Sequence, residues 1–232
     1  IQKLRYFCFS LFYLSYINIS SMMSNYQLFQ NDLPNKVLKS FKGDISIDTE
    51  TLGLNIKRDR LCLIQLKNET DQNIYLIKFD EGLSPKLSKN IKTLLENKSL
   101  TKIFHYGRFD MAVLKQNLKI NVKNIFCTKV ASKLTRTYSS KHGLKDLVCE
   151  ILDIHLDKTE QSSDWSKKKL TKKQIEYAMN DVLYLSEIKN SLNEKLINQK
   201  RFRLFKSIMK FMEIRVDLDL QGWEGIDIFA HK

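Results

Sequence analysis

The stretch GDISIDTET, residues 43–51, decides how this chain folds and where its chemistry lies. Ile45 and Ile47 alternate with polar residues, a pattern that predicts a β-strand. Asp48 and Glu50 lie two positions apart, so their side chains point to the same face of that strand. Two neighbouring carboxylates repel each other unless a cation lies between them. By itself, the pair is equally consistent with two surface acids at the end of a strand.

The segments around this strand predict an α/β fold. Apolar runs at residues 61–66 and 74–79 predict two further strands, and the short polar links between the three strands favour an antiparallel meander. After them, helical and strand patterns alternate, and the last part of the chain is helical. We therefore expect a single domain with a mixed, five- to six-stranded sheet flanked by helices.

Three details of the helices are specific enough to be tested by the structure. Asp32 is placed to cap a helix near residues 34–41. A single long helix is expected over residues 170–196, with Thr171 as its cap. Residues 216–220 alternate between apolar and acidic types, which places them outside the preceding helix.

The first 22 residues differ from the rest of the chain. Two basic residues precede an interrupted apolar run, a pattern that imitates a signal peptide but is too short for a membrane span. Because Met22 and Met23 follow, we expect translation to start at one of them. Residues 1–22 then form a leader outside the domain, which occupies residues 23–232. A targeting or anchoring segment is the alternative.

The composition limits the possible partners and compartment. The 232 residues carry a net charge of +13, which favours polyanions such as nucleic acid, although Lys, Asn and Ile are abundant throughout, as an AT-rich coding sequence would give. None of the four cysteines has the spacing of a metal-binding pair, so free thiols in a reducing, cytoplasmic compartment are expected. We find no glycine-rich phosphate loop or zinc-protease motif, and no membrane partner is expected.

Further acids could join Asp48 and Glu50. Asp110 is expected at the start of a helix that follows a strand, where its alternative role is a simple charge at a helix N-terminus. Tyr177 and Asp181 lie one helical turn apart, so they project from the same face. Asp181 borders an apolar stripe, where an acid needs a partner or remains at the exposed edge.

Four converging carboxylates predict a particular chemistry. Oxygen ligands of this kind favour Mg²⁺ or Mn²⁺, and four acids suffice for two ions. Two such ions about 4 Å apart hold the attacking and leaving oxygens of a phosphodiester during hydrolysis. A tyrosine hydroxyl beside one acid could orient the attacking water.

The motifs, taken together and in order, resemble a known family. The stretches DTE at residues 48–50, HYGRFD at 105–110 and YAMND at 177–181 are similar to the three exonuclease motifs of the DEDDy 3′→5′ exonucleases, closest to the ribonuclease D-like branch. HGLKDL at residues 142–147 and QSSDW at 161–165 resemble the nanoRNase C (NrnC) family. That family comprises compact enzymes that degrade diribonucleotides.

The resemblance implies a fold, an assembly and an activity. We expect a ribonuclease H-like sheet and a homo-octameric ring. The implied reaction is 3′–5′ hydrolysis of short RNA, including the linear dinucleotide pGpG, to mononucleotides, with two Mg²⁺ or Mn²⁺ ions in each active site. The implied catalytic residues are four metal ligands and a tyrosine that positions the water: Asp48, Glu50, Asp110, Asp181 and Tyr177.

The resemblance also implies substrate contacts. Leu54 matches a leucine that wedges between bases, and His105 is expected beside the scissile nucleotide. We further expect Arg136, His142 and Lys145 to form a basic cluster that holds the 5′ phosphate. The alternative for Arg136 and Lys145 is ordinary solvated charge.

The sequence is also consistent with other functions. Ribonuclease D-type trimming of tRNA is the nearest alternative, and the basic charge allows longer RNA or DNA as partners. A non-catalytic nucleic-acid-binding protein would also fit the fold, although all four acids and the tyrosine are present.

Overall fold

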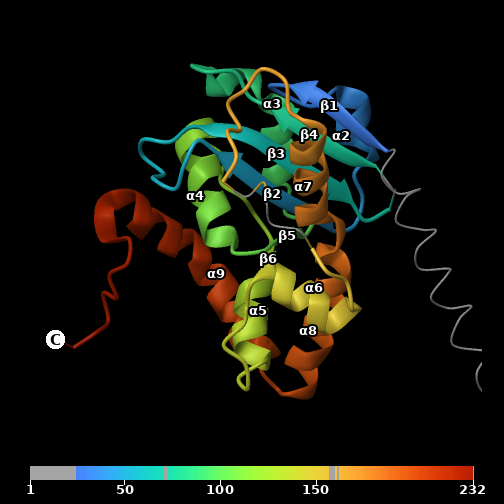
Figure 1. Ribbon diagram of the computed structural model, residues 1–232. Helices are drawn as coiled ribbons and strands as arrows, with labels where there is room; N and C mark the ends of the chain where they lie inside the picture. The colour runs from blue at the N-terminus through green and yellow to red at the C-terminus, as the bar shows by residue number, and fades with distance from the viewer. Residues whose placement is uncertain (1–24, 71–72, 157–159, 161, 232) are drawn as a thin grey trace, which may run out of the picture.

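The computed structural model describes residues 25–70, 73–156, 160 and 162–231. The expected leader at residues 1–22 and Gln161 of the QSSDW stretch lie outside these ranges. The described chain forms a sheet with the strand order β1-β4-β3-β2-β5-β6, covered by helices on both faces (Figure 1). The predicted α/β class and the mixed sheet of five to six strands are confirmed, with six strands observed.

Parallel and antiparallel pairs coexist in the sheet. β2, β3 and β4 form the expected antiparallel meander, and β1, β5 and β6 add to it in parallel. β3 is buried along its whole length, as its apolar sequence requires. The strands are β1 (Tyr26–Gln30), β2 (Ile45–Thr51), β3 (Leu61–Asn68), β4 (Ile74–Lys78), β5 (Lys102–Phe104) and β6 (Ile125–Cys127).

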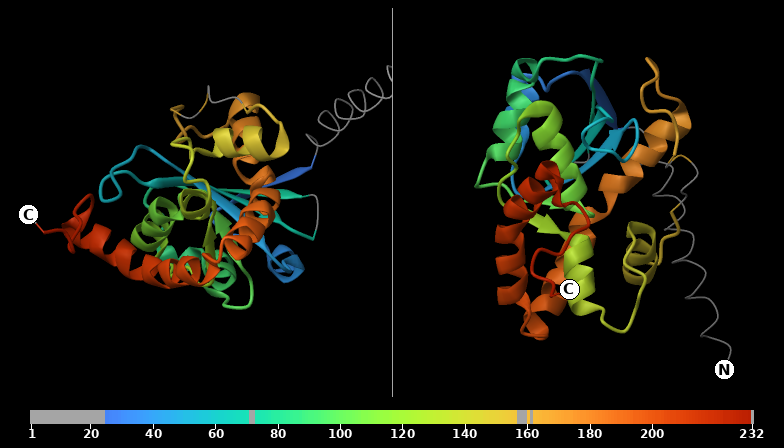
Figure 2. Two further views of the ribbon diagram at one scale, coloured as in Figure 1. Left: turned by 90° about the horizontal axis from the view of Figure 1, so that it is seen from below. Right: turned by 90° about the vertical axis from the view of Figure 1, so that its left-hand side faces the viewer.

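The helices divide between the two faces of the sheet. α7 packs on one face, and α3 and α4 pack on the other. Figure 2 shows α6 and α9 on opposite sides of α5. In the described part of the chain, no helix is both long and apolar enough to cross a membrane. The helices are α2 (Asn35–Ser40), α3 (Lys89–Glu96), α4 (Gly107–Leu118), α5 (Thr128–Thr135), α6 (Leu144–Leu152), α7 (Lys172–Leu183), α8 (Leu185–Asn198) and α9 (Phe202–Leu218).

Asp32 caps a different helix from the one expected. α2 begins after Pro34 and has no side-chain cap. The carboxylate of Asp32 instead accepts hydrogen bonds from the backbone N–H groups of Asn90 and Ile91, at 2.9 and 2.8 Å. These groups lie in the first turn of α3, so Asp32 caps a helix that is distant in sequence but adjacent in space.

The long helix expected over residues 170–196 is two helices. α7 and α8 are separated at Tyr184, whose backbone leaves the helical region (φ −106°, ψ 1°). The break lets α7 cover the sheet while α8 turns to pack against α5 and β5. The start is as predicted, because Thr171 and Gln174 form a complete capping box.

The C-terminal prediction is also wrong, because α9 continues to Leu218 and a further helical turn spans Asp219–Trp223. Asp219 is buried, and its carboxylate accepts hydrogen bonds from Arg108 and Arg215. A buried carboxylate needs such partners, and the two arginines hold residues 216–220 in helical form against α4.

Candidate active site

The end of strand β2 presents two acids to one face of the sheet. Asp48 and Glu50 alternate with Thr49, and the register with β3 shifts after Glu50. Gln65 is the cross-strand partner of Asp48, and its side-chain amide donates to Glu50 Oε1 at 3.4 Å. β2 therefore fixes both carboxylates just where strand pairing becomes irregular.

Helix α7 brings a third acid to this pair. Carboxylate oxygens of Asp48, Glu50 and Asp181 all lie within 4.8 Å of one another. Tyr177 lies one turn before Asp181, and its hydroxyl hydrogen-bonds with that carboxylate. The structure thus brings together residues that lie more than 120 positions apart in the sequence.

Asp110 approaches from the other side of β2. It lies in the first turn of α4, is 4% exposed and accepts a hydrogen bond from the hydroxyl of Thr49 at 2.6 Å. Asp110 does not belong to the 4.8 Å group, yet it is close enough to raise the pKa of Asp48 and Glu50. It is therefore the fourth acid of one electrostatic cluster.

Asp48, Glu50 and Asp110 are buried close to other acids. Burial, and then the neighbouring acids, raise the pKa of Asp48 and Glu50 well above the usual values. Burial raises the pKa of Asp110 to about 7, although hydrogen bonds from Thr49 oppose the shift. Among the described residues, none of these three acids forms an ion pair with lysine or arginine. A bound cation would offset the repulsion among these carboxylates.

The donor set fits a hard divalent cation. Oxygens of Asp48, Glu50 and Asp181 are spaced closely enough to contact one ion, and Asp110 lies beside them. Carboxylate oxygens without histidine or cysteine favour Mg²⁺ or Mn²⁺ over softer metals. These residues would therefore hold the metal.

Tyr177 stays neutral beside this cluster. Burial raises the pKa of its hydroxyl above the usual value, and the negative charges of Asp181, Glu50 and Asp48 add to the effect. At neutral pH the hydroxyl therefore keeps its proton and acts through hydrogen bonding, not as a base.

The acids lie in a cleft of about 710 Å³, within the range of small-ligand sites. Leu54 is on its rim and is 81% exposed. The Asp59 carboxylate accepts a hydrogen bond from the backbone of Asn55 at 2.9 Å, and any side chain at Gly53 would collide with Asp59. This tight turn presents an apolar side chain to the cleft.

Other lining residues were not singled out from the sequence as ligand contacts. Lys129 lies over the ring of Tyr106 at 4.2 Å, and both line the cleft beside the predicted His105. His105 is held by Thr128, whose Oγ1 is 3.0 Å from His105 Nδ1. An exposed tyrosine in the left-handed region (φ 69°) at the start of α4 has no signature in the sequence.

Trp165 also lines the cleft, and its ring lies 6.0 Å from that of Tyr177. It is 2% exposed and packs with Leu63 and Met179 between α7 and the sheet. The side chain thus belongs to the core and to the cleft wall at once.

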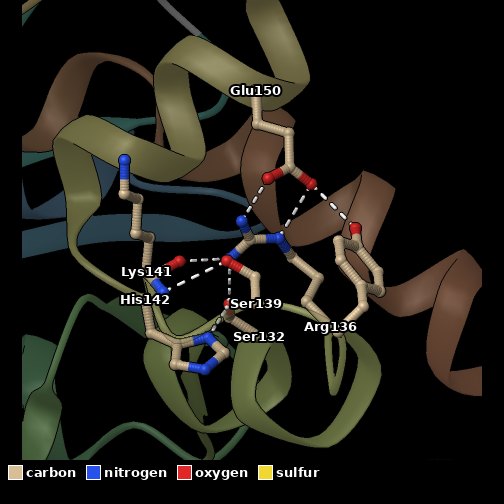
Figure 3. A network of polar contacts seen from close by, with 7 residues as sticks. Ser132, Arg136, Ser139, Lys141, His142 and Glu150 are labelled. Carbon is tan, nitrogen blue, oxygen red and sulfur yellow. Dashed lines mark hydrogen bonds and ion pairs between the residues drawn. The ribbon is translucent and has the colours of Figure 1, made fainter.

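The expected basic cluster is not assembled as predicted. Lys145 lines the cleft, but Arg136 and His142 do not. Arg136 is 1% exposed, and its guanidinium pairs with Glu150 and donates to Ser132 (Figure 3). Sequence could not reveal this arrangement, because Glu150 reaches Arg136 from the next helix. Arg136 is therefore enclosed in the fold and paired with Glu150 instead of facing a 5′ phosphate in the cleft.

The network around Arg136 has a different consequence. Arg136 donates to the carbonyl of Lys141 at 2.6 Å, and Ser132 Oγ lies 2.8 Å from His142 Nδ1 (Figure 3). These contacts hold the loop that leads to Gly143, the first of three successive residues that line the cleft. The network is thus a support for the cleft wall.

We expect Glu150→Ala to lower the free energy of unfolding by about 2–3 kcal/mol, because a buried guanidinium loses its carboxylate. Arg136 lowers the pKa of Glu150 to about 2, so the stabilisation is present above the ordinary pKa and is lost as the pH falls toward 2. Urea unfolding at pH 7 measures the effect. Glu213→Ala, which breaks the more exposed pair with Lys123, should cost less than about 1 kcal/mol. Equal losses in the two variants would contradict the prediction.

Known proteins share this fold and these segments. A family model described as 3'-5' exonuclease matches residues 26–197. Ribonuclease D of Desulfotalea psychrophila is 34% identical over 170 residues, which is 73% of this chain but 44% of that protein. The chain thus spans less than half the length of this relative.

Solved structures give a match over nearly the whole of the compared chains. Brucella melitensis NrnC bound to pGG is 44% identical, with a TM-score of 0.83, and the match covers 90% of this chain and 99% of that one. The same protein with bound Mg²⁺ matches with 43% identity, a TM-score of 0.83, and 90% and 100% coverage.

Proposed function

Because the chain belongs to the 3′–5′ exonuclease family, in the branch of Brucella NrnC, we propose that it is a metal-dependent 3′–5′ exoribonuclease. Its substrates are short oligoribonucleotides, especially diribonucleotides such as pGpG, and its products are nucleoside 5′-monophosphates. The observation that carries the proposal is the group of Asp48, Glu50 and Asp181 oxygens within 4.8 Å, with Asp110 and Tyr177 beside it.

The metal ligands in this proposal are the four acids. When bound, two Mg²⁺ or Mn²⁺ ions supply positive charge to the attacking and leaving oxygens of the phosphodiester. Asp48, Glu50 and Asp181 provide the closest set of oxygens, and Asp110 completes the second site. The hydrogen bond from the Thr49 hydroxyl fixes the Asp110 carboxylate where it lines the cleft.

Tyr177 and His105 position the reacting groups. The Tyr177 hydroxyl, protonated at neutral pH, orients the attacking water toward the phosphorus next to the 3′-terminal nucleotide. His105 lies in the same cleft and contacts the scissile nucleotide. Both residues act by hydrogen bonding. The negative charge of the phosphate would be stabilised by the bound cations.

The cleft suits a short RNA that is bound without selection of its bases. Exposed Leu54 packs against a base face, a contact that every base can make. Lys145 lies in the first turn of α6 and attracts the phosphate at the 5′ end. The structure of Brucella NrnC with pGG supports a dinucleotide as the substrate class.

Trimming of tRNA or other longer RNA is the second candidate function. The relatives named ribonuclease D favour this function. The match to this chain covers less than half the length of each of them. The near-complete coverage of NrnC favours short RNA instead.

We further propose a homo-octamer located in the cytoplasm. Exposed apolar side chains on α9 and the segment after it offer a surface for subunit contacts: Phe211, Ile214, Trp223, Ile226, Ile228 and Phe229. Light scattering tests the assembly, and a persistent monomer would contradict it.

A ladder of labelled RNAs, two to about twenty nucleotides long, tests the proposed function. With Mg²⁺ or Mn²⁺ we expect the dinucleotide to be hydrolysed faster than the longer RNAs, and with EDTA we expect no hydrolysis, because the acids then lack their cations. Faster hydrolysis of the longest RNA would support trimming. Hydrolysis that persists in EDTA would refute the metal mechanism.

A further inference from the structure

A lysine-rich segment adjoins one wall of the cleft. Ser162, Ser163 and Trp165 line the cleft, and the segment that follows them is the orange loop leading into α7 in Figure 1. Five lysines occur among its seven residues from 167 to 173. We call them the lysine tract: Lys167, Lys168, Lys169, Lys172 and Lys173.

The tract is fixed to the cleft wall. The side-chain amide of Gln174 donates to Ser163 Oγ at 2.9 Å and to the carbonyl of Asp164 at 3.0 Å. Trp165, which lines the cleft and precedes the tract in the sequence, is buried against α7. Because both ends of the segment are tied to α7, the lysines keep a set place beside the cleft.

The charge of the tract is largely uncompensated. All five lysines are exposed, and the described residues 162–176 contain two acids, Asp164 and Glu176. Lys172 pairs with Glu176 at 3.7 Å, and Asp164 accepts hydrogen bonds from Ser166. Among the described residues, the other four lysines form no ion pair.

Two of these lysines lie at the N-terminus of a helix, where a positive charge is unfavourable. Lys172 and Lys173 occupy the first turn of α7, which contains no acid. The helix dipole makes this end positive, so cations here repel both the helix end and one another. A polyanion beside the segment would relieve that repulsion.

We propose that the lysine tract binds the phosphodiester backbone of RNA that is too long for the cleft, while the 3′ end lies at the acids. The inference rests on the proposed exonuclease function and extends it to a second class of substrate length. Each phosphate contact releases counterions, so affinity should rise with RNA length and fall steeply with salt.

Binding of two- and twenty-nucleotide RNA to matched variants tests the tract. The triple variant K167Q/K168Q/K169Q removes three charges from the tract. The control K36Q/K39Q/K42Q removes three exposed charges from α2 and the turn after it; α2 packs with α3 against the main core cluster. All proteins also carry Asp48→Asn to prevent hydrolysis.

We expect the tract variant to bind the twenty-nucleotide RNA about tenfold more weakly. Its slope of log affinity against log salt should be shallower by about two, the value for three phosphate contacts on a single strand. Affinity for the dinucleotide should change less than about twofold, and the control should behave as the parent does. A slope unchanged in the tract variant, or equally reduced in the control, would overturn the proposal.

The two proposals fail separately. If the wild-type protein hydrolyses no RNA, the proposed function is wrong, while the salt slope still reports whether the tract binds the backbone. If dinucleotides are hydrolysed but the slope is unchanged, the function stands and the tract proposal fails.

Discussion

Replacing Asp48 with asparagine is expected to lower RNA hydrolysis by at least about 10⁴-fold and to stabilise the metal-free protein. The loss follows because Asp48 is central to the group of carboxylates that would hold the cations, on which the proposed displacement depends. The gain follows because Asp48 is buried among like charges, and an amide of the same shape removes one of them. Activity and stability should therefore move in opposite directions.

Thermal unfolding in EDTA measures the gain, which should be at least about 2–4 °C in Tm, the shift that 1 kcal/mol gives in a chain of this size. Mg²⁺ should raise the Tm of the wild type and have little effect on Asp48→Asn. Glu194→Gln, the same charge change at an exposed position of α8, should alter neither activity nor Tm. A metal-free Asp48→Asn protein less stable than the wild type would refute the electrostatic account.

The same cluster predicts the pH dependence of the metal-free protein. The folded pKa of Asp48, Glu50 and Asp110 exceeds the unfolded value, so the folded state binds more protons. Stability in EDTA should therefore rise as the pH falls from 8 through about 7, where Asp110 becomes protonated. Asp48→Asn should show a smaller rise.

Tyr177→Phe is expected to lower kcat about 10²- to 10³-fold and to leave metal binding intact. The substitution removes one positioned hydroxyl, and such groups contribute this much when they act on the reacting centre. The acids keep their places, because the ring still packs beside Trp165. The stabilisation by Mg²⁺ should therefore equal that of the wild type.

Single-turnover kinetics with a dinucleotide measures the chemical step in Tyr177→Phe. Tyr184→Phe removes a hydroxyl at the break between α7 and α8, outside the residues that line the cleft, and should leave the rate within about twofold. A Tyr177→Phe enzyme with a normal rate, or one that no longer responds to Mg²⁺, would contradict the positioning role.

The periodic parts of the site could be read from sequence. Alternation along a strand predicted that Asp48 and Glu50 share one face of that strand. Helical spacing predicted that Tyr177 and Asp181 share one face of their helix. Both rules depend on local geometry alone. Thr49 was missed for the same reason: it points to the opposite face of β2, where its partner Asp110 arrives from a distant helix.

Features set by tertiary contacts could not be read in this way. In the sequence, Arg136 cannot be distinguished from an exposed cation, because its partner Glu150 lies on a different helix, α6. Asp32 caps a helix that begins more than fifty residues later in the chain. The apolar pattern continues through the break at Tyr184, so periodicity predicts one helix where the structure has α7 and α8. Contacts between residues distant in the sequence determine these three features.

The position of Trp165 gives this molecule an internal optical probe. The chain has two tryptophans, and Trp165 is 2% exposed whereas Trp223 is 42% exposed. The indole of Trp165 borders the cleft and lies 6.0 Å from the Tyr177 ring, so a ligand beside the acids changes its surroundings. In a Trp223→Phe protein, the fluorescence of a single indole would report cleft occupancy directly, without a label on protein or RNA.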